Sequence, residues 1–127
     1  MRQVGSALSM YTADNNDRLP LADVWMDGAN AYTKNRKLFR SPVFGLSTGA
    51  YGIAFRHGLE SQNPGRILAP EHVAMVFESV NIRWNASGEL NLLPDPPRHS
   101  RDGGDVNVIE FADGHAGYAL ADRADIK

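Results

Sequence analysis

Apolar residues near the amino end recur at helical spacing. Val4, Leu8 and Tyr11 stand at positions i, i+4 and i+7, so a helix would place them on one stripe. A polar run at 14–17 ends this pattern. Pro20 opposes its continuation, because proline lacks the N–H that a helix interior requires. The sequence therefore predicts a helix over 1–13 that packs through Val4, Leu8 and Tyr11.

Strand-like segments occupy the carboxyl end. Two of them, 106–112 and 115–120, flank Asp113-Gly114, a dipeptide that favours a two-residue hairpin turn. The apolar face of this hairpin would carry Ile109, Phe111, Ala116, Tyr118 and Leu120. We expect the amino-terminal helix to pack on that face, and His115 to point away from it, beside Glu110.

The elements between these ends indicate the fold class. A short helix is expected near 25–32, and a strand is expected at 73–80, where apolar residues dominate. The helices precede the strands, which is typical of an α+β fold. We divide the 127 residues into a helix at 1–13, a helix and loop region at 14–70 and an antiparallel sheet at 71–127, all in one domain.

Charge and composition argue against several classes of protein. The net charge is −2 and no run of Lys or Arg lies beside aromatic residues, so nucleic-acid binding is not expected. The chain has no cysteine, which excludes disulfides and thiolate metal sites. His99 and Ser100 are adjacent, and neighbouring strand residues point to opposite faces, so they do not form a base–nucleophile pair and we do not expect an enzyme. Met1 leads directly into the helical pattern, which we interpret as a chain joined partway along a longer helix.

Some polar residues could bind a metal ion. His99, Asp113 and His115, with Glu110 or Asp102, offer the imidazole and carboxylate ligands that suit zinc. Alternatively, Asp113 is a turn residue and both histidines hydrogen-bond the preceding loop to the hairpin.

Two further patterns each have a functional and a structural interpretation. Oxygen side chains at 14–17 could bind calcium, or they could form a solvated helix exit in which Asp and Asn bond nearby backbone. Trp25 and Trp84 could present an aromatic sugar-binding surface, or they could pack in the core.

The order of these landmarks resembles the pseudopilin-like family that has a prepilin-type amino terminus and a carboxyl-terminal H-X9-DG domain. The segment 3–20 is similar to the family's helix end and its exit to a proline, and 32–42 and Tyr51-Gly52 resemble later blocks. His99 and the run Asp113-Gly114-His115 resemble the signature at the end. Thirteen residues separate His99 from Asp113, where the family name implies nine, and a longer loop at 102–105 would account for the difference.

The resemblance implies a pilin-like fold, in which the first helix packs on an antiparallel sheet that ends in a hairpin. It also implies a structural subunit of a secretion or surface filament. The partners would be other pilin-like subunits or secretion-system proteins, at the periplasmic or cell-surface face of a bacterial inner membrane. Membrane contact would occur only through an apolar helix half that this sequence does not contain.

The resemblance implies no resident cofactor, but related pseudopilins bind calcium near the carboxyl end. By that analogy Asp102 and Asp105 are candidate calcium ligands. The alternative function is a soluble metal- or carbohydrate-binding protein that uses His99, Asp113 and His115.

Overall fold

The computed structural model describes residues 1–41, 50–101, 104–120 and 126. The helices are α1 (Arg2–Asp14), α2 (Trp25–Thr33) and the short 3-10 helices η1 (Ala22–Val24), η2 (Arg36–Phe39), η3 (Pro64–Arg66), η4 (Pro70–His72) and η5 (Leu90–Leu92). The strands are β1 (Ile53–Arg56), β2 (Ala74–Glu78), β3 (Ser87–Gly88), β4 (His99–Arg101), β5 (Gly104–Phe111) and β6 (Ala116–Leu120). The predicted α+β class is confirmed. No helix in these ranges combines the length and apolar content that crossing a bilayer requires.

The described strands form one six-stranded sheet. Its order is β3-β1-β2-β5-β4, and β6 also pairs with β5. All of these pairs are antiparallel except β1 with β3, which is parallel. The expectation of a purely antiparallel sheet within 71–127 is therefore corrected: the sheet is mixed, and it recruits β1 from earlier in the chain.

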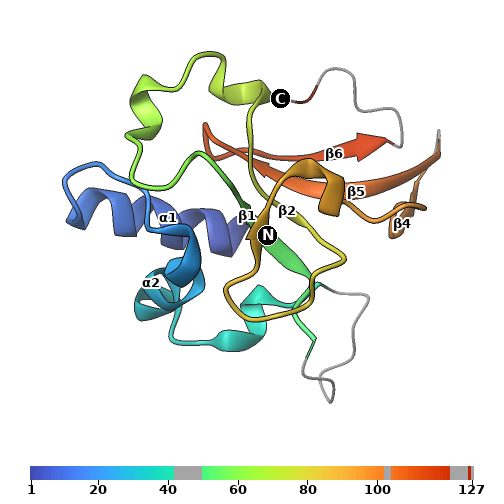
Figure 1. Cartoon of the computed structure of the whole chain (residues 1–127), viewed down its shortest axis with the longest axis horizontal. Coiled ribbons are helices and arrows are strands. Elements are labelled where there is room, and N and C mark those ends of the chain that lie inside the picture. The colour runs from blue at the N-terminus through green and yellow to red at the C-terminus, as the bar shows by residue number, and fades with distance from the viewer. Residues whose placement is uncertain (42–49, 102–103, 121–125, 127) are drawn as a thin grey trace.

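Helix α1 lies on one face of the sheet, beside α2 (Figure 1). Val4 and Leu8 are each 1% exposed and belong to the main core cluster, whereas the half-buried Tyr11 packs over Gly28 of α2. Gly5 allows a close approach to β5, because a Cβ at this position would overlap the carboxylate of Glu110 and lie 2.6 Å from its Cδ. Glu110 therefore points toward α1.

The β5–β6 hairpin differs from the predicted one by one residue in register. Its loop has three residues, 112–114, because the Phe111 N–H donates to the His115 carbonyl at 2.9 Å. Gly114 has a φ of 95°, the left-handed conformation that a three-residue loop needs. Val108 consequently pairs with Tyr118. Since neighbouring strand residues face opposite sides of a sheet, Tyr118 shares its face with Glu110, not with Ile109.

The predicted packing of α1 on the Ile109 and Phe111 face of the hairpin is wrong. Ile109 and Phe111 are buried with Phe77, Leu93 and Ala119 in a second core cluster, on the sheet face opposite α1. Tyr118 is 53% exposed. The main core cluster, which contains the buried residues of α1, instead includes Ile53, Phe55, Met75, Val76 and Ala112. Leu120 pairs with Val106 through its backbone, and its side chain lies outside the described residues.

Candidate functional site

A buried polar cluster lies where two strands meet along one edge of β5. Val106 pairs with both His99 and Leu120, and Ile109 pairs with both Phe77 and Gly117, so β2 and β4 share one edge of β5 while β6 takes the other. Asn107 and Val108 lie between the end of β2 and the start of β4. At these two residues, side-chain hydrogen bonds take the place of backbone pairing between strands along this edge of β5. The Val108 N–H donates to Glu78 Oε1 at 2.7 Å, and Asn107 Oδ1 accepts from the Arg98 N–H at 3.0 Å.

Glu78 is the centre of this cluster. Its side chain is 1% exposed, and Oε1 lies 2.7 Å from Nε2 of His99. Ser41 Oγ donates to Oε2 at 3.1 Å, and Arg98 Nη1 lies 3.6 Å from the same oxygen. Arg98 also donates to the carbonyls of Gly52 and Ser79, at 2.8 and 2.6 Å. Burial lowers the pKa of Arg98, and the Glu78 carboxylate opposes this.

These contacts show that the cluster joins segments of the sheet to one another. A charged acid inside a sheet must be paired, because an unpaired buried charge is costly. Glu78 of β2 has partners from two other segments, namely Ser41 and the consecutive residues Arg98 and His99. Sequence reasoning missed Glu78 and Arg98. A signal was present: Glu78 is the charged residue in the apolar run 73–80, and charged residues are almost never fully buried unless paired.

The structure does not bring His99 to the other candidate metal ligands. His99 pairs with Val106, whereas Asp113 and His115 lie beyond Phe111 at the other end of β5. The five residue steps from Val106 to Phe111 amount to about 17 Å. Among the residues that the structure describes, no three His, Cys, Asp or Glu side chains gather as a metal site would require. Asp105 is described and exposed, and Asp102 lies outside the described residues.

Asp113 and His115 form a local turn structure. His115 Nδ1 lies 2.5 Å from Asp113 Oδ1, and the His115 N–H donates to the same oxygen at 3.1 Å. The imidazole stacks on the Phe111 ring, with 4.6 Å between centroids, so it does not lie beside Glu110 as predicted. Partial burial acts to raise the pKa of Asp113, but the hydrogen bonds and charge of His115 outweigh it and lower the pKa overall.

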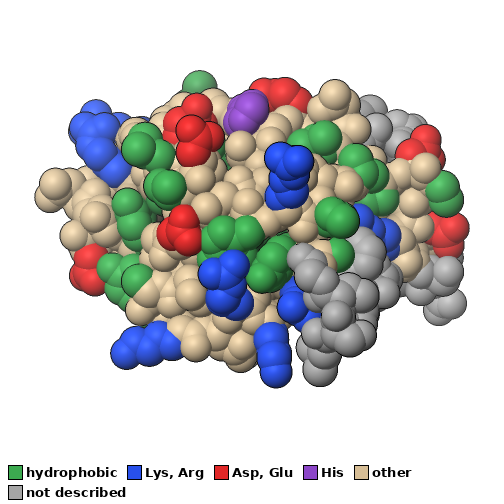
Figure 2. All heavy atoms as spheres, turned by 60° about the horizontal axis from the view of Figure 1, so that its bottom comes forward, with side chains coloured by type: hydrophobic (Ala, Val, Ile, Leu, Met, Phe, Trp, Pro, Cys, Tyr) green, Lys and Arg blue, Asp and Glu red, His purple; other side chains and the backbone are tan. Residues whose placement is uncertain are grey.

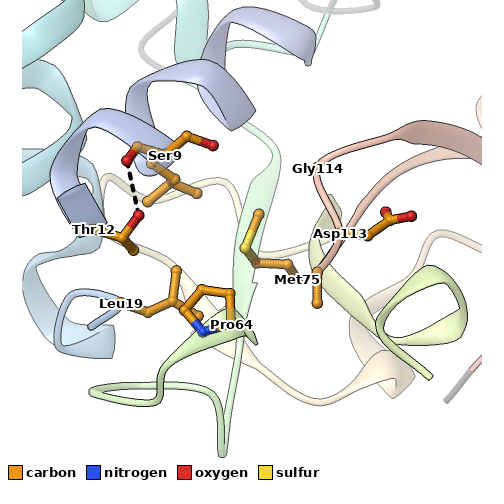
Figure 3. Close-up of a pocket in the computed structure, with 9 residues that line it drawn as sticks. Ser9, Thr12, Leu19, Pro64, Met75, Asp113 and Gly114 are labelled. Carbon is orange, nitrogen blue, oxygen red and sulfur yellow. Dashed lines mark hydrogen bonds between the residues drawn. The ribbon is translucent and has the colours of Figure 1, made fainter. Parts of the chain in front are cut away.

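A cavity of about 170 Å³ lies between α1 and this turn (Figure 3). Its walls are Leu8, Ser9, Thr12, Leu19, Pro64, Met75, Ala112, Asp113 and Gly114. The Thr12 hydroxyl donates to the Ser9 carbonyl at 2.8 Å, and Figure 3 shows the Asp113 carboxylate turned away from these two residues. The polar groups of the walls therefore do not converge on a common point.

The other candidates are also held in structural contacts. Asp14 Oδ2 accepts from the Tyr32 hydroxyl at 2.7 Å, and Asn15 Nδ2 donates to the Tyr11 carbonyl at 2.8 Å. This agrees with a helix exit. Trp25 is fully buried and donates to the Ala86 carbonyl at 2.7 Å, so it does not present a surface for sugars.

One histidine–serine contact was not predicted. Nε2 of His57 lies 3.1 Å from Oγ of Ser87, and both residues are near the β1–β3 edge. In serine nucleophile sites the base is itself oriented by a third group. The contacts found in the described ranges give His57 no such third side chain, so this pair links the loop after β1 to β3.

Comparison of the chain with protein-family models, with curated proteins and with solved structures found no match.

Proposed function

We propose that this chain is an interaction module, the pilin-like head of a filament subunit, and not an enzyme. Its reactive side chains support this proposal. Glu78 pairs with both Arg98 and His99, and His115 is stacked and hydrogen-bonded within its turn. Groups engaged in this way stabilise a scaffold, so function would come from surfaces.

The observation that carries the proposal is the two-sided character of α1. One side is buried on the sheet through Val4 and Leu8. The other side borders an open groove of about 230 Å³ against α2 and η2, lined by Gln3, Ser6, Ala7, Met10, Tyr32, Thr33 and Leu38. Met10, a large apolar side chain, is 54% exposed there. A helix of a second copy would cover Met10 and place side chains in this groove.

The wider context follows from the same proposal. The partners would be pilin-like subunits or secretion-system proteins, and the head would face the periplasm or the cell surface. Assembly by packing requires neither a resident metal nor nucleic acid.

Site-specific cross-linking tests the proposal. The chain has no cysteine, so Met10→Cys provides a single attachment point for a benzophenone maleimide. Irradiation with an epitope-tagged second copy should yield a covalent dimer whose cross-link maps to the groove. The matched control is Leu68→Cys, which is 90% exposed and lies outside α1. Equal or greater dimer yield from Leu68→Cys would contradict the proposal, because exposure alone would then explain the reaction.

A further inference from the structure

A cluster of cationic and aromatic side chains lies where η2 meets the segments around residues 51 and 84. We call Arg36, Arg40, Tyr51 and Trp84 the arginine–tryptophan patch. The guanidinium carbon of Arg36 lies 3.8 Å from the centroid of the Trp84 ring, and that of Arg40 lies 5.5 Å from the Tyr51 ring. Arg36 also donates through Nε and Nη2 to the Tyr51 hydroxyl, at 3.4 Å each. Stacking of this kind favours a cation held over a ring face.

The aromatic base of the patch is fixed by the core. Trp84 packs edge-on against Phe39 and Tyr51, with centroids 5.3 and 5.1 Å apart, and Phe39 is fully buried. The indole Nε1 of Trp84 donates to Asp27 Oδ1 of α2 at 2.8 Å. A guanidinium held on such a base loses less conformational entropy when it binds an anion.

The outward charge of the patch is positive, although the whole chain carries −2. Lys34, Lys37 and Arg83 are exposed on the same segments. Asp27, an acid beside the patch, is engaged by Asn85 and Trp84. These hydrogen bonds, and then the charge of Arg36, lower the pKa of Asp27. Figure 2 shows the face toward α2 and η2, with Lys and Arg side chains around hydrophobic ones.

The arrangement favours a protein partner over a sugar or a base. Arg36 covers a face of Trp84, so that ring face is not open for stacking. Trp, Tyr and Arg are the residue types that dominate the energetics of protein interfaces. An apolar neighbour is present as well: Ile82 is 45% exposed, and its carbonyl accepts from the Tyr51 N–H at 2.9 Å.

We propose that the arginine–tryptophan patch binds an acidic segment of a partner protein, with Arg36 holding a carboxylate and Ile82 contacting an apolar side chain beside it. This surface uses different residues from the α1 groove, so the inference can be tested separately from filament assembly.

Binding of a defined peptide tests the inference. The probe is a short synthetic peptide rich in glutamate with interspersed leucine, and its counterpart has glutamine in place of glutamate. Tryptophan fluorescence reports binding, because Trp84 lies in the patch and the other tryptophan, Trp25, is fully buried. The glutamate peptide should bind in a salt-dependent manner, and Arg36→Gln should weaken it about tenfold, as the loss of a charge-assisted hydrogen bond predicts. Lys37→Gln and Arg83→Gln, which change exposed side chains, should each weaken it by a smaller factor.

The control is Arg66→Gln, an exposed arginine in η3, away from η2 in Figure 1. It should change the affinity by less than about twofold. Equal binding of the glutamine peptide, equal loss in Arg66→Gln, or no binding would overturn the inference. Tighter Arg36-dependent binding of heparin or single-stranded DNA would also overturn it, because the partner would then be a different polyanion.

Discussion

Glu110 makes the stability of this protein depend on pH near neutrality. Its side chain is 1% exposed under α1, and Oε2 has no hydrogen-bond partner in the described part of the chain. Burial raises its pKa from 4.5 to about 7, against the opposing charges of the amino terminus, His115 and Arg2, while Asp113 adds to the rise. The neutral acid is therefore the form that the α1–sheet interface accommodates.

The sign and magnitude of the pH effect on the free energy of unfolding follow from proton linkage. Between pH 4.5 and about 7 the folded state binds the proton of Glu110 more tightly than the unfolded state does. The contribution of Glu110 to the free energy of unfolding is therefore fully present below pH 4.5 and is lost as pH rises to about 7. At 1.36 kcal/mol per pKa unit, this loss amounts to about 3 kcal/mol.

Urea unfolding of the wild-type chain and of Glu110→Gln across this pH range measures the effect. Glutamine keeps the shape of the side chain and removes its ionisation. From acid to neutral pH, the free energy of unfolding of the variant should therefore rise by about 3 kcal/mol relative to that of the wild type. Glu71→Gln, a change at an exposed glutamate, should follow the wild-type curve. If the free energies of unfolding of wild type and Glu110→Gln differed by the same amount at every pH, the reasoning would be refuted.

Two further substitutions test the packing and the buried cluster. Gly5→Ala should lower the free energy of unfolding by about 1–3 kcal/mol, because the new Cβ overlaps the Glu110 carboxylate; in a double-mutant cycle with Glu110→Ala the two costs should not add, and strict additivity would show that the two residues do not touch. Arg98→Ala should cost about 3–5 kcal/mol in urea unfolding, because it removes a cation from the buried Glu78 and the donors to two carbonyls. Addition of Glu78→Gln should recover part of that loss, and failure to do so would mean that charge pairing is not the main role of Arg98.

Local patterns predicted the elements that local physics controls. The spacing of Val4 and Leu8 predicted α1 and its buried side, and the apolar run at 73–80 predicted β2. The order of these elements predicted the α+β class. In each case the period of the side chains, near four for a helix turn and two for a strand, is written in consecutive residues.

The predicted grouping of His99 with Asp113 and His115 failed because it depends on contacts that are distant in sequence. His99 was expected near Asp113, but its partner is Glu78. Glu78 and His99 meet because the end of β2 and the start of β4 lie next to each other along one edge of β5. The cation–aromatic contact of Arg36 with Trp84 likewise joins segments that share no local pattern.

By itself, then, the sequence determined which segments become helix or strand and which of their positions are apolar. Tertiary structure decided which face each strand turns to α1. The hairpin adds an example: Gly114 takes a left-handed conformation in a three-residue loop, and the register moves by one residue. Because strand side chains alternate with a period of two, that step placed Tyr118 on the face of Glu110 instead of the face of Ile109. Packing decided which face lies under α1, since Ile109 and Phe111 are buried with Phe77 and Leu93 in the second core cluster while Glu110 lies against Gly5 of α1.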